Sequence, residues 1–240
     1  MAGTYTNRGF TIALGLFAVL LAGYAFLQSP LFSLQSVQLT GNDRLSVGLV
    51  LERTELDYGV NLLEIEVRAV ESALAELPFI VDVSVARRLP GTLVVRVRER
   101  TPIAYVAGER GFWAIDSDGV LLYGVDAPTK PLPLVTADLN DQVVREAGVV
   151  LDGPHIKAAL DFVGALGVTT LASLSEIHAS AAGVTAYTRD RITVSLGTGG
   201  DMREKAEVFE VLFAKAMQGN LNISHIDVRH PRSPVVEEKR

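Results

Sequence analysis

The sequence contains no cysteine, and this absence excludes both a disulfide framework and metal sites built from thiolates. A chain without cysteine is compatible with a bacterial periplasm. Basic residues are outnumbered, since 22 Lys and Arg stand against 28 Asp and Glu, and the formal net charge is −6. A protein that binds nucleic acid needs a basic surface to contact the phosphates, so we expect no nucleic-acid partner.

The usual catalytic and metal-binding motifs are also missing. The sequence has no G-x-S-x-G elbow, and no glycine-rich loop is followed by a Walker lysine. The histidines show neither H-E-x-x-H nor H-x-x-x-H spacing; they are His155, His178, His225 and His230. We therefore predict a protein that is not an enzyme and that has no cofactor, no metal and no small-molecule substrate.

Two short segments resemble ligand-binding loops but are better explained as turns. Residues 116–119 (Asp-Ser-Asp-Gly) open like a calcium loop, yet the glutamate that such a loop requires further on is absent. We interpret them as a hairpin turn, because Asp and Gly accept the backbone angles of a turn. Residues 197–200 (Gly-Thr-Gly-Gly) precede a predicted helix without completing a phosphate-binding pattern, and we interpret them as a strand-to-helix turn.

Charged residues are absent between Arg8 and Asp43, and residues 10–27 of this stretch form one long apolar run. Its eighteen residues approach the roughly 20 that a helix needs to cross a bilayer. A cleaved secretory signal is the rival interpretation, but its apolar region usually has only about 7–15 residues and ends at a small-x-small cleavage site, which this run lacks. We predict a transmembrane helix at 10–27 after a cytoplasmic tail at 1–9.

Residues 35–101 have the pattern of one small domain. Alternating apolar residues predict strands, apolar residues at helical spacing predict helices, and Ser46 is the expected N-cap of the first helix. A three-stranded sheet with two helices on one face buries both apolar surfaces, so we predict an α+β fold. The expected elements are a strand at 37–42, helices at 45–56 and 65–77, and strands at 81–89 and 92–100.

Residues 102–236 are predicted to form a second domain, mainly antiparallel β with two or three helices, followed by a polar tail at 237–240. The segment 131–135 (PLPLV) is expected to be an extended edge of its sheet. The last helix is expected at 202–217, with Asp201 as its cap. The residues expected to point inward from this helix are Val208, Val211, Leu212 and Ala216.

Four stretches of the sequence carry the motifs of a known family. They are Leu-Pro-Gly followed by a strand and Glu-Arg-Thr-Pro-Ile-Ala at 89–104, the Ile-Asp-Ser-Asp-Gly-Val hairpin at 112–121, Leu-Pro-Leu at 132–134, and Ile-Asp-Val-Arg at 226–229. In this order, and with one apolar helix before them, they make the chain resemble the FtsQ/DivIB family of bacterial cell division proteins over nearly its whole length. The first domain resembles a POTRA domain.

This resemblance implies a non-enzymatic scaffold of the divisome that links early and late cell division proteins. The implied location is the inner membrane, in a single-pass type II topology with the N-terminus cytoplasmic, the bulk periplasmic and the protein enriched at the division septum. The implied partners are a coiled-coil pair of the FtsB/FtsL type and septal cell-wall synthesis proteins. The alternative is a POTRA-type chaperone or binding module of a membrane protein assembly or secretion system.

The final strand, expected at 223–228, is predicted to be the partner-binding edge. Pro231 and Pro234 prevent it from continuing as a regular ladder, so its outer side is expected to accept a strand from a partner. On this hypothesis, Arg229 binds a carboxylate of the incoming chain. The predicted edge residues are Ile226, Val228, Arg229 and His230.

The remaining site prediction concerns the end of the first domain. Glu99 and Arg100 are candidates for a second partner-binding surface, and packing at the junction between the domains is the alternative. Core packing is likewise the alternative for Ile226 and Val228, because strict alternation along a strand must send some apolar residues inward.

Overall fold

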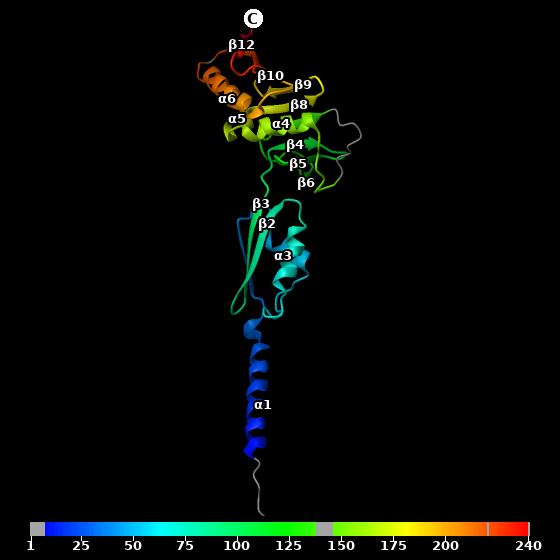
Figure 1. Cartoon of the computed structure of the whole chain (residues 1–240), viewed down its shortest axis with the longest axis vertical. Helices are drawn as coiled ribbons and strands as arrows, with labels where there is room; N and C mark the ends of the chain where they lie inside the picture. Colours follow the sequence, from blue (N-terminus) through cyan, green and yellow to red (C-terminus); the bar gives the residue numbers. More distant parts are fainter. Residues whose placement is uncertain (1–7, 138–145, 220, 240) are drawn as a thin grey trace, which may run out of the picture. The chain divides into compact units, whose positions relative to one another are not determined.

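The computed structural model describes residues 8–137, 146–219 and 221–239 and divides into two compact units (Figure 1). The first unit, Met1–Glu99, contains the apolar helix and a three-stranded sheet. The second unit, Arg100–Arg240, contains a nine-stranded sheet in the residues described. The α+β class and the β-α-α-β-β order predicted for the first domain are confirmed.

Helix α1, Arg8–Leu27, covers the predicted apolar run. Its segment Gly9–Leu27 is long and apolar enough to cross a membrane, and none of it is buried within the protein. An apolar helix that is exposed on all sides requires an apolar surrounding other than a protein core. It is therefore a candidate membrane span.

The first unit continues with a small β-α-α-β-β fold. Its sheet has the order β1-β3-β2, in which β1 is parallel and β2 antiparallel to β3. Figure 1 shows α3 packed on one face of this sheet. The Ser46 Oγ accepts a hydrogen bond from the Leu49 N–H at 3.2 Å, which confirms the predicted N-cap of α2. The elements are η1 (Pro30–Phe32), β1 (Ser36–Thr40), α2 (Val47–Thr54), α3 (Val67–Ala75), β2 (Ile80–Arg88) and β3 (Thr92–Glu99).

The second unit is built on one sheet of order β12-β11-β10-β9-β8-β7-β4-β5-β6. Among the described strands, five of the eight pairings are antiparallel, in agreement with the prediction. The strands are β4 (Ala104–Ala107), β5 (Phe112–Ile115), β6 (Leu121–Val125), β7 (Leu134–Ala137), β8 (Leu174–Ser180), β9 (Gly183–Thr188), β10 (Thr193–Gly197), β11 (Ile223–Asp227) and β12 (Val235–Glu238).

Strand β7 corrects one prediction, because it lies inside the sheet and not at its edge. It pairs in parallel with β4 on one side and with β8 on the other. Proline cannot donate to a ladder, and this suggested an edge for residues 131–135. However, β7 begins at Leu134, after both prolines of the segment, so all of its N–H groups are available for pairing.

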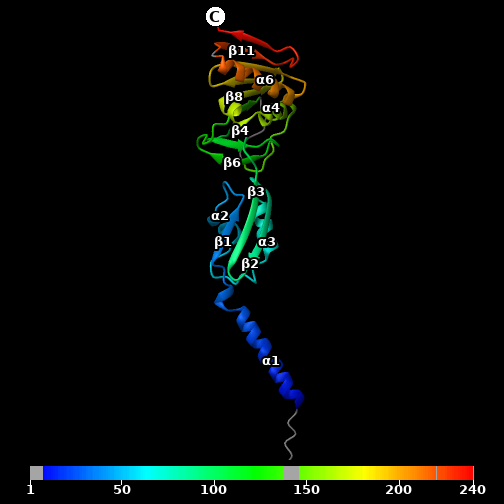
Figure 2. The same ribbon diagram turned by 90° about the vertical axis from the view of Figure 1, so that its left-hand side faces the viewer.

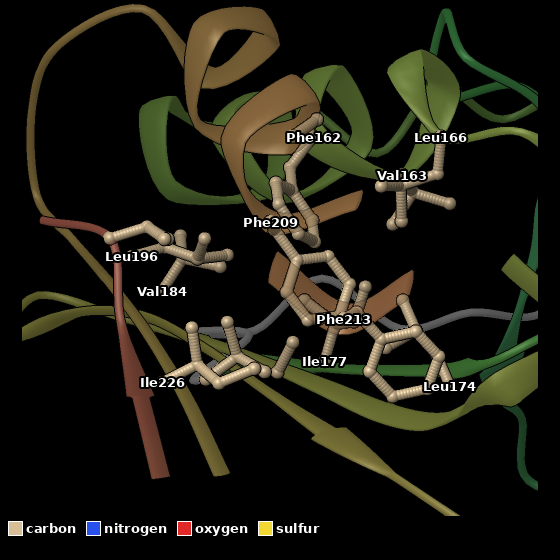
Figure 3. Close-up of a cluster of buried hydrophobic side chains, with 14 of the residues drawn as sticks. Phe162, Val163, Leu166, Leu174, Ile177, Val184, Leu196, Phe209, Phe213 and Ile226 are labelled. Carbon is tan, nitrogen blue, oxygen red and sulfur yellow. The ribbon is translucent and has the colours of Figure 1, made fainter. Parts of the chain in front are cut away.

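The helices of the second unit pack on its sheet and bury a large apolar cluster (Figure 3). They are α4 (Pro154–Ala165), α5 (Val168–Ser173) and α6 (Met202–Gln218). As predicted, the Asp201 carboxylate caps α6 by accepting the Arg203 N–H at 2.9 Å and the Glu204 N–H at 3.4 Å.

The predicted inward face of α6 is wrong for one of its four residues, Val211. Val211 is 54% exposed, whereas Ala216 is buried, and the half-buried Val208 and Leu212 pack against the core. The face that does point inward is centred on Phe209 and Phe213, whose rings lie one turn apart and 5.4 Å from each other. The large aromatic rings bury more area than valines, so they decide the rotation of the helix. The buried residues of α6 are Met202, Lys205, Ala206, Phe209, Phe213 and Ala216.

Candidate partner-binding edge

Strand β11 is paired on both sides, so it is not the edge that the sequence predicted. It is parallel to β10, with Ile226 opposite Val194, and antiparallel to β12, with Ile226 opposite Val236. Figure 2 shows β12, at the red end of the chain, beside β11. While β12 stays in place, neither side of β11 is available to pair with a strand from a partner.

The prolines that suggested an open edge lie in the turn that brings β12 back. The chain leaves β11 after Asp227, and the Ser233 N–H binds the His230 carbonyl at 2.9 Å within the turn. Pro231 and Pro234 both precede β12, so neither removes an N–H from that strand. Two β-branched residues, Val235 and Val236, follow at once and form the ladder. The predicted polar tail at 237–240 accordingly begins within β12.

Ile226 and Val228, which were predicted to lie at the partner-binding edge, have their side chains in the core. Both side chains are fully buried. Figure 3 shows Ile226 in the same cluster as Val184 and Leu196, under α6. The alternative considered for these two residues, core packing, is the one that the structure favours.

Strand β12 forms the end of the described sheet on this side. All four of its residues are exposed, and Val235 and Val236 keep 52% and 39% of their surfaces accessible. Its inner side is held by the β11 ladder and by the Ser224 hydroxyl, which donates to the Glu237 carbonyl at 3.2 Å. The outer backbone groups of an exposed strand at a sheet end are a template for another strand.

Arg229 binds Asp227 within the same chain. The guanidinium Nε lies 2.9 Å and 3.0 Å from the two carboxylate oxygens, and Nη2 lies 2.6 Å from Oδ2. The Arg229 backbone N–H also donates to the carboxylate, at 3.0 Å. The guanidinium hydrogen bonds hold the pKa of Asp227 below its usual value, although partial burial opposes them. Arg229 is 59% exposed, so its outer side still faces solvent.

A buried lysine stabilises the turn beneath this edge. The side chain of Lys205, on α6, is 1% exposed, and its ammonium donates to the carbonyls of Leu196, at 2.6 Å, and Gly199. Burial lowers the pKa of Lys205, while the charge of Asp227 acts in the opposite direction. The segment 197–200 is the turn between β10 and α6, as predicted. The hydrophobic pattern alone gave no signal for a buried lysine at this position.

The side chains of Glu99 and Arg100 form hydrogen bonds in different units. The Glu99 carboxylate accepts the Arg44 N–H at 2.9 Å and the Leu45 N–H at 2.8 Å, both in the loop before α2. Arg100 donates to the buried carboxylate of Asp116 at 2.6 Å and to Asp118 at 3.1 Å. Both residues therefore stabilise loops of their own unit.

The segment 116–119 is a hairpin turn, as predicted, and Asp116 is its organising residue. One carboxylate oxygen of Asp116 accepts the backbone N–H groups of Asp118, at 3.0 Å, and Val120, at 2.9 Å, while the other binds Arg100. Such a pattern is typical of an Asx turn. In the part of the chain that the structure describes, no group of three or more His, Asp or Glu side chains could hold a metal ion.

Comparison with known families assigns both parts of the chain. Residues 32–100 match the family model of the POTRA domain, FtsQ-type. The fold and this match define a protein that carries a POTRA domain. Residues 104–229 match the family model of the Cell division protein FtsQ/DivIB, C-terminal, over more than half of the 240 residues. The chain belongs to the FtsQ/DivIB family of cell division proteins, which confirms the resemblance seen in the sequence.

Similar proteins come from distant bacteria. The cell division protein FtsQ of Streptomyces collinus is 29% identical, over 97% of this chain and 89% of its own length. FtsQ of Myxococcus fulvus is 30% identical, over 85% of this chain and 72% of its own. The solved major extracytoplasmic domain of DivIB from Geobacillus stearothermophilus is 21% identical, with a TM-score of 0.33, and the match covers 51% of this chain and 98% of that domain.

Proposed function

We propose that this protein is a non-enzymatic scaffold of the divisome, which links early and late cell division proteins at the septum. The observation that carries the proposal is β12, a fully exposed strand with two valines at the end of a large sheet. An extended partner segment that adds to such a strand gains main-chain hydrogen bonds for affinity, and its alternate side chains give selectivity.

The proposed binding edge is β12, in place of the β11 edge expected from the sequence. Solitary sheet edges invite aggregation, and natural proteins usually block them with charge, proline or a cover. Here the strand exposes Val235 and Val236 together with Glu237 and Glu238. Two valines can remain exposed in the free chain if a partner protein covers them in the complex.

The proposed partners are a coiled-coil pair of the FtsB/FtsL type and septal cell-wall synthesis proteins. Arg229 and His230, both exposed near the start of the turn before β12, are the side chains proposed to contact the incoming chain. Arg229 would then share its guanidinium between Asp227 and a partner carboxylate. For Glu99 and Arg100, the hydrogen bonds within each unit support a structural role more than a recruitment surface.

The proposed placement is the inner membrane, in single-pass type II topology with a short cytoplasmic tail, α1 as the anchor and both units in the periplasm. Exposure of the whole apolar helix supports this placement. The family match over residues 104–229 favours a division scaffold over a module of an assembly or secretion system.

The test uses substitutions on β12 with a matched control on the same domain. Lysine at both Val235 and Val236 should abolish co-purification of the FtsB/FtsL-type pair, because lysine on an edge strand opposes pairing. Val211→Lys changes an equally exposed valine on α6 and should leave co-purification intact. Retention of the pair by the β12 variant would refute strand addition there. A fluorescent fusion spread evenly around dividing cells would count against the division role itself.

A further inference from the structure

Four large apolar side chains of the first unit are exposed in three separate segments outside α1: η1, the α2–α3 loop and the β2–β3 turn. Leu31 is 48% exposed, Tyr58 55%, Val60 38% and Leu89 57%. In the described part of this unit beyond α1, the remaining large apolar residue of this kind is Val81, near the start of β2.

Backbone hydrogen bonds bring these three segments together. The Leu34 N–H binds the Val60 carbonyl at 2.7 Å, and the Gly59 N–H binds the Leu34 carbonyl at 3.0 Å, which fixes the 58–60 loop against the segment after η1. The Gln35 N–H binds the Gly91 carbonyl at 2.8 Å, which fixes the tip of the β2–β3 hairpin against the same segment. Leu89 lies at this tip.

The segment that collects these loops follows directly from α1. Only Gln28 and Ser29 separate the end of the helix at Leu27 from η1. The Asn61 side chain donates to the Leu27 carbonyl at 2.8 Å, so the loop that carries Tyr58 and Val60 is bound to the last turn of the helix. The four exposed side chains are therefore at the end of the domain where the chain would leave the membrane.

We propose that this end of the POTRA domain sits in the membrane interface, with Leu31, Tyr58, Val60 and Leu89 inserted at the boundary between headgroups and acyl chains. This inference rests on the membrane anchoring proposed above. The lipid surface is the fitting occupant because the patch is continuous with the apolar helix. Side chains at such a surface reach about 5–10 Å into the boundary layer.

The chemistry of the patch fits a lipid boundary better than a dry protein surface. Tyrosine is favoured at membrane interfaces, because its ring is apolar and its hydroxyl stays hydrated. Next to Leu89, the exposed Arg88 donates to Gln38 at 2.7 Å and presents a cation at headgroup level. Beside the helix end, the Glu64 carboxylate accepts a hydrogen bond from the Gln28 amide at 2.8 Å.

The chain has no cysteine, so one introduced cysteine gives a full-length chain with a single spin label at a known position. This makes a direct test possible. The variants are Tyr58→Cys and Leu89→Cys, each reconstituted in vesicles of phosphatidylethanolamine and phosphatidylglycerol. Both labels should collide more often with oxygen, which concentrates in lipid, than with a water-soluble nickel chelate. Val81→Cys is the matched control: it lies eight residues from Leu89, about 26 Å along the strand, and should show the reverse preference.

A label at Leu20→Cys in α1 separates the two proposals. If it reports lipid while the label at Tyr58 or Leu89 reports water, the anchor stands and the inserted patch is refuted. If the patch binds a protein partner and not lipid, the labels at Tyr58 and Leu89 should report water, because the vesicles contain the chain alone. If the label at Leu20 also reports water, the membrane anchor fails and the inserted patch fails with it.

Discussion

Glu99 and Arg100 are joined by one peptide bond, yet the Glu99 carboxylate binds the Leu45 N–H of the first unit and Arg100 binds Asp116 of the second. The two compact units meet in the sequence between these residues. Each unit therefore has a charged side chain at its boundary that fixes one of its own loops. These hydrogen bonds give both Glu99 and Arg100 a structural role that needs no partner protein.

Replacement of Glu99 should loosen the loop before α2. Glu99→Ala leaves the N–H groups of Arg44 and Leu45 without this acceptor, at a cost of about 1 kcal/mol, the low end for such groups because the site is partly exposed. Amide hydrogen exchange at Leu45 should become correspondingly faster. Glu99→Gln keeps one acceptor oxygen and should lose less protection. Unchanged protection at Leu45 in the alanine variant would contradict the assignment, and Arg100→Ala should affect only the loop around Asp116.

The rotation of α6 predicts a large difference between two of its residues. Phe209→Ala removes a fully buried ring from the core and should lower the free energy of unfolding of the second unit by about 3–5 kcal/mol. Val211→Ala changes an exposed side chain and should stay within about 0.5 kcal/mol. The single tryptophan, Trp113, lies in this unit, so its fluorescence during denaturant unfolding of the full chain reports both values. Equal effects of the two variants would show that the helix is turned otherwise.

Local patterns were sufficient to predict most of the fold. Period-two and helical spacing located the strands and helices, and the caps Ser46 and Asp201 were found because a cap depends on residues only two or three positions away. The turn at 197–200 was predicted for the same reason. Such features need no knowledge of tertiary structure.

The candidate site was predicted less well, because pairing between strands depends on where the chain turns. Pro231 and Pro234 mark a break in the ladder, but they do not tell whether the chain then leaves the sheet or returns to it. The returning strand β12 pairs with the side of β11 that seemed open. The Ile226 side chain lies in the core with Phe209 and Phe213 of α6. Lys205 was missed for a related reason: its partners are backbone carbonyls of another segment, and no sequence pattern identifies them.

Lys205 should be required for the stability of the β10–α6 turn. Lys205→Met keeps most of the side-chain volume but leaves the carbonyls of Leu196 and Gly199 without their donor, which costs about 1–3 kcal/mol. Removing a buried charge offsets part of this cost, so we expect a net loss near 1 kcal/mol. Trp113 fluorescence in denaturant measures it, with Lys215→Met, on an exposed position of the same helix, as the control. A variant more stable than the parent would show that desolvation of the ammonium outweighs its hydrogen bonds.

The Asp227–Arg229 pair should make the second unit sensitive to acid. The guanidinium of Arg229 lowers the pKa of Asp227 in the folded chain, whereas the unfolded chain has the ordinary value near 3.9. The folded state thus binds fewer protons, so the pair stabilises it above that ordinary value, and this stabilisation is lost as the pH falls through the lowered pKa. Asp227→Asn should therefore be less stable than the parent at neutral pH, and the difference should shrink in acid below about pH 4. Unfolding curves of both chains at several pH values, followed by Trp113 fluorescence, measure this difference. A gap that stayed constant down to the acid limit of folding would mean that the carboxylate does not titrate against Arg229.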